Sequence, residues 1–356
     1  MSKQLLDDER DAGELRRQAA LARAIGSPFV AAVLESGAHQ LARAPLTATV
    51  FARWPGDRAA AALAMRFNAA LHALARRNTP ARLGALYRGE HRDIDGAVGE
   101  ALALHDGFIA DWMQHTPQTN EVGRAAAILA ALKVARTRFD LPVELLELGA
   151  SAGLNLNLCR YAYEIGGVAA GDPASPVRIA PDWIGAPPPG TPVEVVAARG
   201  VDLAPLDVTD AATRERLMAF VFADQSARSR RLESALALAR AWPPRVERGD
   251  AVTWLRDRLA EPAPAGRCRA VVHSMVTQYL DDAARARLDA VIAAAGAAAT
   301  EDRPLVRIGF EWTEDRAAVL LRLTSYPHGG MEVLAECHPY GATITWRAPA
   351  APSLTK

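Results

Sequence analysis

The sequence predicts an α/β protein in which a helical N-terminal domain, residues 1–140, precedes a sheet domain, residues 141–356. Apolar residues recur at spacings of three and four as far as Phe139, a pattern typical of amphipathic helices. From Leu141 onward, short apolar and β-branched runs alternate with helical stretches. That alternation predicts a mostly parallel sheet whose strands are joined by crossover helices.

Five helices are expected in the first domain. The apolar periodicity places them at residues 8–26, 27–44, 56–77, 95–115 and 120–139. Ser27 and Pro28 supply a cap and a first-turn proline, and Asn120 precedes Glu121 and a long apolar stripe. We therefore expect an all-helical bundle.

The second domain is expected to alternate strands with helices. Strands are predicted at residues 143–148, 193–198, 268–276, 304–312 and 342–346, with one more directly before Arg248. Helices are predicted at residues 208–220, 226–242 and 281–296. An insertion at residues 166–192 is so rich in proline and glycine that neither a regular helix nor a central strand is expected there.

Charge and composition argue against several classes of protein. The 41 basic and 41 acidic residues balance, which removes the usual electrostatic argument for a nucleic-acid or anionic-membrane partner. The N-terminus lacks the apolar segment of a secretory signal, and no apolar run approaches the roughly 18 residues of a membrane span. The three cysteines, Cys159, Cys268 and Cys337, are too far apart for a paired-ligand site. A cytoplasmic protein without a bound metal is expected, and its oligomeric state is left open.

The segment Gly149–Gly153, with sequence GASAG, fits two templates. As G-x-S-x-G it is a nucleophile elbow, which would make Ser151 the nucleophile of an α/β-hydrolase. That enzyme needs a later histidine, for which His328 and His338 are available, but the upstream His-Gly-rich oxyanion turn is missing. The alternative is a small-residue turn beneath a nucleotide-like cofactor.

The cofactor interpretation accounts for more of the sequence. Asp202 follows the strand after GASAG and Asp250 follows the next strand, at the positions where a carboxylate can bind ribose hydroxyls or an exocyclic amine. A dinucleotide is disfavoured because its G-x-G-x-x-G pattern would need glycine where the chain has Ser151 and Leu154. A cofactor without a pyrophosphate would not require those glycines.

Two resemblances extend this interpretation. The segments ELGASAG, GVDLAP, RGDA and VVHSMVTQYL resemble the successive motifs of class I S-adenosylmethionine-dependent methyltransferases. A second set of segments, PQTNEVGRAA, LELGASAGLNLNLCRYAY, GDPASPV, FVFADQSARSRRL and VVHSMVTQYL, resembles an uncharacterised bacterial family, domain of unknown function 2332, from about Ser27 to Trp346. The resemblance implies a Rossmann-like methyltransferase fold behind a helical domain, with S-adenosylmethionine as cofactor. The bacterial family brings no known reaction.

The methyltransferase resemblance also implies roles for single residues. Gly149, Ala150, Ser151 and Gly153 would lie beside the methionine part of the cofactor, with Glu147 ordering the loop, Asp202 on the ribose, and Asp250 and Ala251 on the adenine. The gap from Gly153 to Asp202 is longer than usual, so Glu164 is a competing candidate for the ribose.

Polar residues near the expected substrate site complete the set of candidates. His273, at the end of its strand, is a candidate general base or a substrate-holding group, although a satisfied core histidine is equally compatible with that position. The other pocket candidates are Asn120, Asp224, Gln225, Ser274, Gln278 and Tyr279. Asn120 is also a plain helix-capping candidate, as Asp202 and Asp250 are candidates for turns and caps.

The function expected from the sequence is methyl transfer from S-adenosylmethionine to an unidentified small-molecule acceptor. Two alternatives remain open. One is an esterase-like hydrolase that uses Ser151, and the other is a non-catalytic ligand-binding or regulatory protein of the same fold.

Overall fold

The computed structural model describes residues 3–118 and 120–347, with only the backbone described for residues 3–12. The chain folds into two compact units. The helical unit comprises Met1–Thr119 and Asp210–Arg230, and the sheet unit comprises Asn120–Thr209 and Arg231–Lys356. The protein is thus α/β, with a helical N-terminal region, as the sequence predicts.

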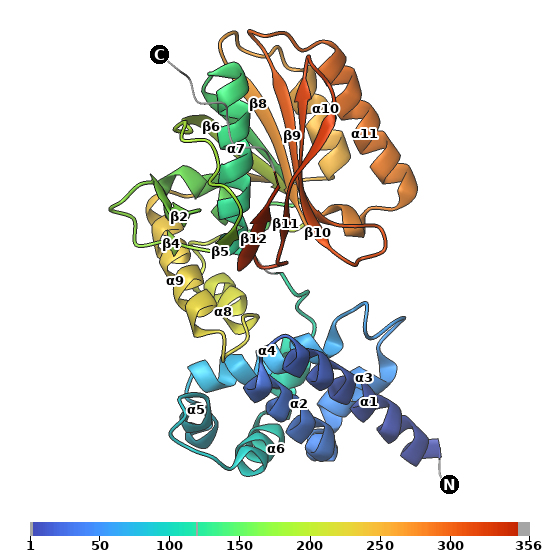
Figure 1. Ribbon diagram of the computed structural model, residues 1–356. Coiled ribbons are helices and arrows are strands. Elements are labelled where there is room, and N and C mark those ends of the chain that lie inside the picture. Colours follow the sequence, from blue (N-terminus) through green and yellow to red (C-terminus); the bar gives the residue numbers. More distant parts are fainter. Residues whose placement is uncertain (1–2, 119, 348–356) are drawn as a thin grey trace. The chain divides into compact units, whose positions relative to one another are not determined.

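The helical unit is a bundle around one apolar core (Figure 1). Its helices are α1 (Lys3–Ala24), α2 (Pro28–Gln40), α3 (Pro45–Arg53), α4 (Leu63–Arg76), α5 (Ala81–Tyr87), α6 (Ile94–Trp112) and α8 (Ala211–Ala219). Pro28 and Pro45 occupy first-turn positions, where the missing N–H costs nothing. Gly37 lets α2 approach α4 closely, because a Cβ there would lie 2.5 Å from a ring carbon of Phe67.

Two segments belong to different units from those that the sequence suggests. Helix α7 (Ala125–Phe139) packs in the sheet unit, where its residues contact strands β8 (Cys268–Ser274), β9 (Leu305–Trp312) and β10 (Val319–Tyr326). Helix α8 belongs to the helical unit, and Phe220 and Phe222 just after it join the helical core. Helical periodicity predicts both helices correctly, but it carries no information about which neighbour an apolar face will meet.

The sheet unit is built on a nine-stranded sheet with the order β5-β12-β11-β10-β9-β8-β1-β6-β7. The strands are β1 (Val143–Leu148), β5 (Asp182–Ile184), β6 (Val195–Asp202), β7 (Val246–Arg248), β8 (Cys268–Ser274), β9 (Leu305–Trp312), β10 (Val319–Tyr326), β11 (Met331–Cys337) and β12 (Thr343–Trp346). Strands β7, β6, β1, β8 and β9 are parallel neighbours, and β9 to β12 pair antiparallel.

The order of the five parallel strands positions the site. Along the chain they come third, second, first, fourth and fifth, so the chain leaves β1 in one direction and returns on its other side at β8. All five carboxyl ends therefore meet at one edge, with a topological switch point between β1 and β8. We call this the carboxyl edge of the sheet.

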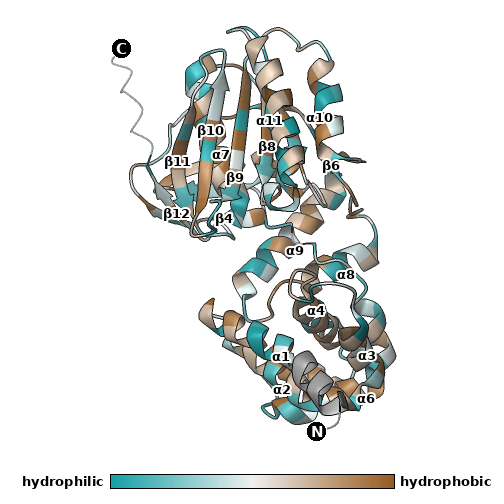
Figure 2. Ribbon diagram, turned by 90° about the vertical axis from the view of Figure 1, so that its right-hand side faces the viewer, coloured by the Kyte–Doolittle hydropathy of each residue, from teal (hydrophilic) through white to brown (hydrophobic). Residues whose placement is uncertain are grey.

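Helices cover both faces of the sheet. Figure 1 shows α10 (Ala251–Ala260) and α11 (Asp282–Ala297) on one face and α7 on the other. On the first face, Leu255 and Leu288 pack with strand residues such as Val271. In Figure 2, α10 and α11 carry both hydrophilic and hydrophobic residues, as expected for amphipathic helices that cover a sheet. Helix α9 (Ser226–Ala241) lies mostly in the sheet unit.

The proline- and glycine-rich insertion contributes only short strands. Strands β2 (Ala162–Ile165), β3 (Val168–Gly171) and β4 (Arg178–Ile179) form a separate three-stranded sheet. Strand β5 pairs with β12 and lies at the edge of the main sheet. Neither a helix nor a central strand is present in residues 166–192.

Candidate functional site

The GASAG loop follows β1 directly at the carboxyl edge. Gly149, Ser151 and Gly153 have φ values of 63°, 55° and 69°, in the left-handed region. A side chain at Gly149 would collide with Val276, because a Cβ there would lie 2.5 Å from Cγ2. Ser151 adopts this region without the freedom of glycine, which costs about 1–3 kcal/mol and is a recurring feature of functional sites. The surrounding structure must therefore hold the loop.

Asp202, at the end of β6, is one of the groups that hold the GASAG loop in place. Its Oδ2 accepts a hydrogen bond from the Ser151 N–H at 2.9 Å, and its Oδ1 accepts one from the Ala204 N–H at 2.9 Å. Glu164, the competing ribose candidate, is an exposed residue on β2 in the small sheet. The structure thus brings Asp202 to the loop, whereas Glu164 belongs to a different sheet.

The segment from Asn120 to Arg124 closes the loop from the other side. The Oδ1 of Asn120 accepts a hydrogen bond from the Leu154 N–H at 2.9 Å. Arg124 donates from Nε to the Pro339 carbonyl at 3.0 Å and lies 3.4 Å from the carbonyl oxygen of Ser274. Asn120 therefore neither caps a helix nor belongs to the helical unit; it fixes the exit of the GASAG loop.

Glu147 is a buried acid on β1, two residues before the loop. Burial raises its pKa from 4.5 to about 8, against smaller opposing effects of the Asn155 amide and the Arg124 guanidinium. The Asn155 Nδ2 donates to Oε1 of Glu147 at 3.3 Å. Oε2 of Glu147 and Oδ1 of Asn155 have no hydrogen-bond partner among the described residues. A buried carboxyl oxygen of β1 and a buried amide oxygen just after the loop thus lack a hydrogen-bond partner among the described residues.

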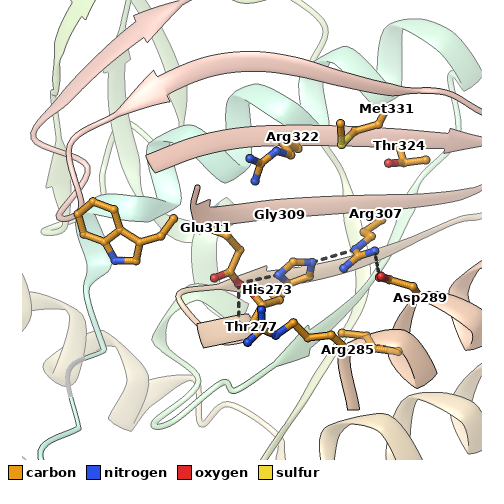
Figure 3. Close-up of a pocket in the computed structure, with 12 residues that line it drawn as sticks. His273, Thr277, Arg285, Asp289, Arg307, Gly309, Glu311, Arg322, Thr324 and Met331 are labelled. Atoms are coloured by element: carbon orange, nitrogen blue, oxygen red, sulfur yellow. Dashed lines mark hydrogen bonds and ion pairs between the residues drawn. The ribbon is translucent and has the colours of Figure 1, made fainter. Parts of the chain in front are cut away.

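His273, near the end of β8, is a buried member of the chain of polar side chains shown in Figure 3. Its Nδ1 lies 2.7 Å from Oε1 of Glu311, and its Nε2 accepts from Nε of Arg307 at 3.0 Å. Because Arg307 can only donate, the proton of a neutral His273 resides on Nδ1 and is donated to Glu311. Arg307 also donates to Asp289 at 2.6 Å.

Glu311 receives further hydrogen bonds in this chain. Its Oε1 accepts from the Val276 N–H at 3.0 Å and from the Thr277 N–H at 3.4 Å. Burial raises its pKa, but the hydrogen bonds from His273 and from these two residues outweigh burial, so the pKa of Glu311 lies below its usual value. Its Oε2 is buried and has no partner among the described residues. Glu311 is therefore an ionised carboxylate inside the protein.

Two candidates have structural partners near their own strand ends. Asp250 caps α10 by accepting from the Thr253 N–H at 2.9 Å, with Ala251 as the first residue of that helix. Gln278, in the 3₁₀ turn Thr277–Tyr279, donates to the Met275 carbonyl at 3.0 Å, and Tyr279 is 82% exposed.

Asp224 and Gln225 lie in the helical unit and not with the other candidates. Asp224 accepts from the Phe29 N–H at 3.1 Å, and Gln225 donates to Oγ of Ser27 at 3.1 Å. Their polar groups thus hold the start of α2. The sequence pattern FVFADQ reflects this anchoring between two segments of one bundle.

Three residues of the site were missed by sequence reasoning, namely Arg124, Arg307 and Glu311. A signal for two of them exists, because Arg307 and Glu311 are polar residues at even spacing within an apolar strand, LVRIGFEW, and therefore share one face. No comparable signal distinguishes Arg124 from other helix-terminal arginines.

The two histidines considered for a hydrolase, His328 and His338, lie at opposite ends of the strands. His328 follows β10, whose last residue pairs with Leu305 at the start of β9, away from the carboxyl edge. His338 follows β11, which ends beside Val319, the partner of Trp312 at the end of β9. Of these two, only His338 is at the edge that carries Ser151.

In residues 3–118 and 120–347, whose side chains are described from residue 13 onward, no group of three described histidine, cysteine or acidic side chains is arranged to hold a metal ion. No helix in these ranges is long and apolar enough to cross a membrane.

Neither a curated protein nor a solved structure matches the chain. The model of one family, described as uncharacterized protein conserved in bacteria (DUF2332), matches residues 12–346. The chain belongs to this bacterial family.

Proposed function

We propose that the protein binds S-adenosylmethionine at the carboxyl edge and transfers its methyl group to a small-molecule acceptor. The observation that carries this proposal is the hydrogen bond from the Ser151 N–H to Asp202. It joins the small-residue loop after β1 to the end of the neighbouring strand β6, beside the switch point where doubly wound sheets bind ligands. The strand order 3-2-1-4-5 is also that of the Rossmann-like class.

The segment after the loop favours a cofactor without a pyrophosphate. In a dinucleotide site the glycine loop leads into an α-helix, whose N-terminus binds the pyrophosphate. Here the loop leads into a 3₁₀ helix, Leu154–Arg160, and then into the small sheet. The aligned N–H groups of an α-helix are therefore not present at this point, which agrees with a cofactor that carries no phosphate.

The acceptors around the loop suit an adenosyl sulfonium compound. Each Asp202 oxygen accepts one backbone N–H, which leaves lone pairs on a half-buried carboxylate for ribose hydroxyls. Asp250, at the end of β7, keeps an exposed carboxylate for the adenine amine. Oδ1 of Asn155, an amide oxygen without a donor among the described residues, would accept from the ammonium group of the methionine part.

Methyl transfer is an in-line displacement at carbon, so alignment and exclusion of water supply most of the acceleration. His273 is the candidate base, with Glu311 holding its Nδ1 proton. Its Nε2 can accept a proton from the acceptor only after Arg307 has left that nitrogen. Base catalysis by His273 thus requires a movement of Arg307.

Titration calorimetry with S-adenosylmethionine, S-adenosylhomocysteine and NAD tests cofactor binding. We expect binding of the two adenosyl sulfur compounds and none of NAD. Asp202→Ala should weaken that binding, whereas Asp257→Ala, an exposed aspartate of α10 paired with Arg256, should not. If neither adenosyl compound gives a binding signal with the wild-type protein, the proposal is wrong. Transfer of labelled methyl groups into a metabolite extract separates an enzyme from a non-catalytic binding protein.

A serine hydrolase is the second candidate. It is favoured by the left-handed φ of Ser151 at a sharp turn after a strand, as in nucleophile elbows. A fluorophosphonate probe would label Ser151 in a hydrolase and leave Ser151→Ala unlabelled. For a cofactor-binding loop we expect no labelling and unchanged S-adenosylmethionine affinity in Ser151→Ala.

A further inference from the structure

A cavity of about 290 Å³ lies on the α11 face of the sheet, beside the antiparallel strands. Its walls come from β8, β9, β10, β11 and α11 (Figure 3). The volume is at the lower end of the range for small-molecule sites, which fits a metabolite smaller than a nucleotide. All of its lining residues belong to the sheet unit.

Gly309 forms the floor of this cavity. It pairs with His273 on β8 and with Arg322 on β10, so these three residues form one row across the sheet. A Cβ at Gly309 would lie 3.0 Å from Cε1 of His273, closer than most real contacts. The absence of a side chain in the middle of the row therefore leaves space between His273 and Arg322.

The cavity carries positive charge that its own acids do not balance. Arg322 is partly buried, and its guanidinium has no hydrogen bond or ion pair with any described residue. Arg285 donates from Nε to the Leu280 carbonyl and forms a 3.7 Å ion pair with Asp282, whose side chain is almost fully exposed. Figure 3 shows Arg322 extending from β10 on one side of the cavity and Arg285 on the other.

The two acids that line the cavity are already engaged. Asp289 accepts from Arg307 at 2.6 Å, and Oε1 of Glu311 accepts from His273 and two backbone N–H groups. Only Oε2 of Glu311, which is buried, has no donor among the described residues. Within the cavity, the groups without a partner are therefore the Arg322 guanidinium and one carboxylate oxygen, whereas Arg285 has only a carbonyl and a solvent-exposed acid as partners.

We propose that this cavity binds a small metabolite that carries an oxyanion, a carboxylate or a phosphate, together with a hydroxyl or amino group. Arg322 and Arg285 bind the oxyanion, with the Thr324 hydroxyl beside Arg322 on the same strand face. The hydroxyl or amino group donates to Oε2 of Glu311. Leu288 and Met331 supply an apolar wall for the carbon skeleton. This binding does not require methyl transfer or an adenosyl cofactor.

Calorimetric titration of the full-length protein with two probe sets tests the proposal. One set contains inorganic phosphate and glycerol 3-phosphate, and the other contains succinate and malate. Saturable binding in either set supports the site, and the set that binds identifies the oxyanion. Within the binding set, the hydroxylated member should bind more tightly than its partner, because it alone donates from a carbon-bound hydroxyl to Glu311.

Variants locate the binding. Arg322→Met should weaken the best probe by roughly tenfold or more, the usual effect of losing a charged hydrogen bond. Arg287→Met removes the same charge from an exposed position of α11 outside the cavity and should change nothing. No binding in either probe set, or equal weakening in both variants, overturns the proposal. Failure to bind S-adenosylmethionine would refute only the proposed cofactor.

Discussion

Replacing Glu147 with glutamine is expected to stabilise the sheet unit at neutral and alkaline pH. The wild-type carboxyl has a folded-state pKa of about 8, raised by burial, against 4.5 when unfolded. A raised folded-state pKa contributes stability that is fully present below pH 4.5 and is lost as the pH rises through 8. Each pKa unit corresponds to about 1.4 kcal/mol, so about 5 kcal/mol is lost across this range and about 3 kcal/mol by pH 7.

The glutamine variant removes this loss because its side chain is neutral at every pH. Its amide can also donate to Oδ1 of Asn155, which has no donor among the described residues. The free energy of unfolding should be measured by urea denaturation between pH 5 and 8.5, with amide hydrogen exchange of β1 as a report on the sheet unit alone. As the pH rises, the free energy of unfolding of the variant should increase relative to that of the wild type.

A matched control lies on the same strand. Glu144 is buried in an ion pair with Nε of Arg269 at 3.0 Å, so Glu144→Gln should destabilise the protein by about 3–5 kcal/mol near neutral pH. The reasoning about Glu147 is refuted if Glu147→Gln behaves like this control, or if its difference from wild type is constant from pH 5 to 8.5. Either result would mean that Glu147 is ionised in the folded protein.

Three further changes test other parts of the structure. Burial lowers the pKa of His72 to about 4, so about 3 kcal/mol of helical-unit stability should be lost as the pH falls from 6.5 toward 4; His72→Gln should flatten this loss in urea titrations. Asn120→Ala leaves the buried Leu154 N–H unpaired and should cost about 1–3 kcal/mol in thermal unfolding, whereas Asn120→Asp keeps the acceptor and should cost less. Gly309→Ala should narrow the cavity beside His273 and weaken oxyanion binding by calorimetry; unchanged affinity would argue against the floor assigned to Gly309.

Much of the α/β architecture is readable from local patterns. Strands β1, β8 and β9 coincide with predicted apolar runs, because a strand buried on both faces must be apolar along its whole length. Strands β10 and β11 were missed, although β10 alternates buried and half-buried residues as a strand with one open face does. Its half-buried residues include Arg322 and Thr324, which line the cavity.

Like the fold, the candidate site could be predicted from the sequence only in part. Asp202 could be predicted because it follows a strand beside the GASAG loop, and parallel strand ends meet at one edge. Asp224 and Gln225 resembled pocket residues but anchor α2 in the helical unit. A polar residue next to an apolar run has the same local pattern whether it meets a ligand or another segment of its own bundle.

The secondary structure of most segments and the small-residue turn after β1 follow from the sequence, because each depends on residues close together in the chain. The family also follows from the sequence, because its motifs are read directly along the chain. The packing of α7 on the sheet, the contacts of Arg307 and Glu311 with His273, and the place of Arg322 beside Gly309 follow from the folded chain alone. These contacts join residues distant in sequence. Which faces meet is decided by packing of the whole chain, and no local periodicity encodes it.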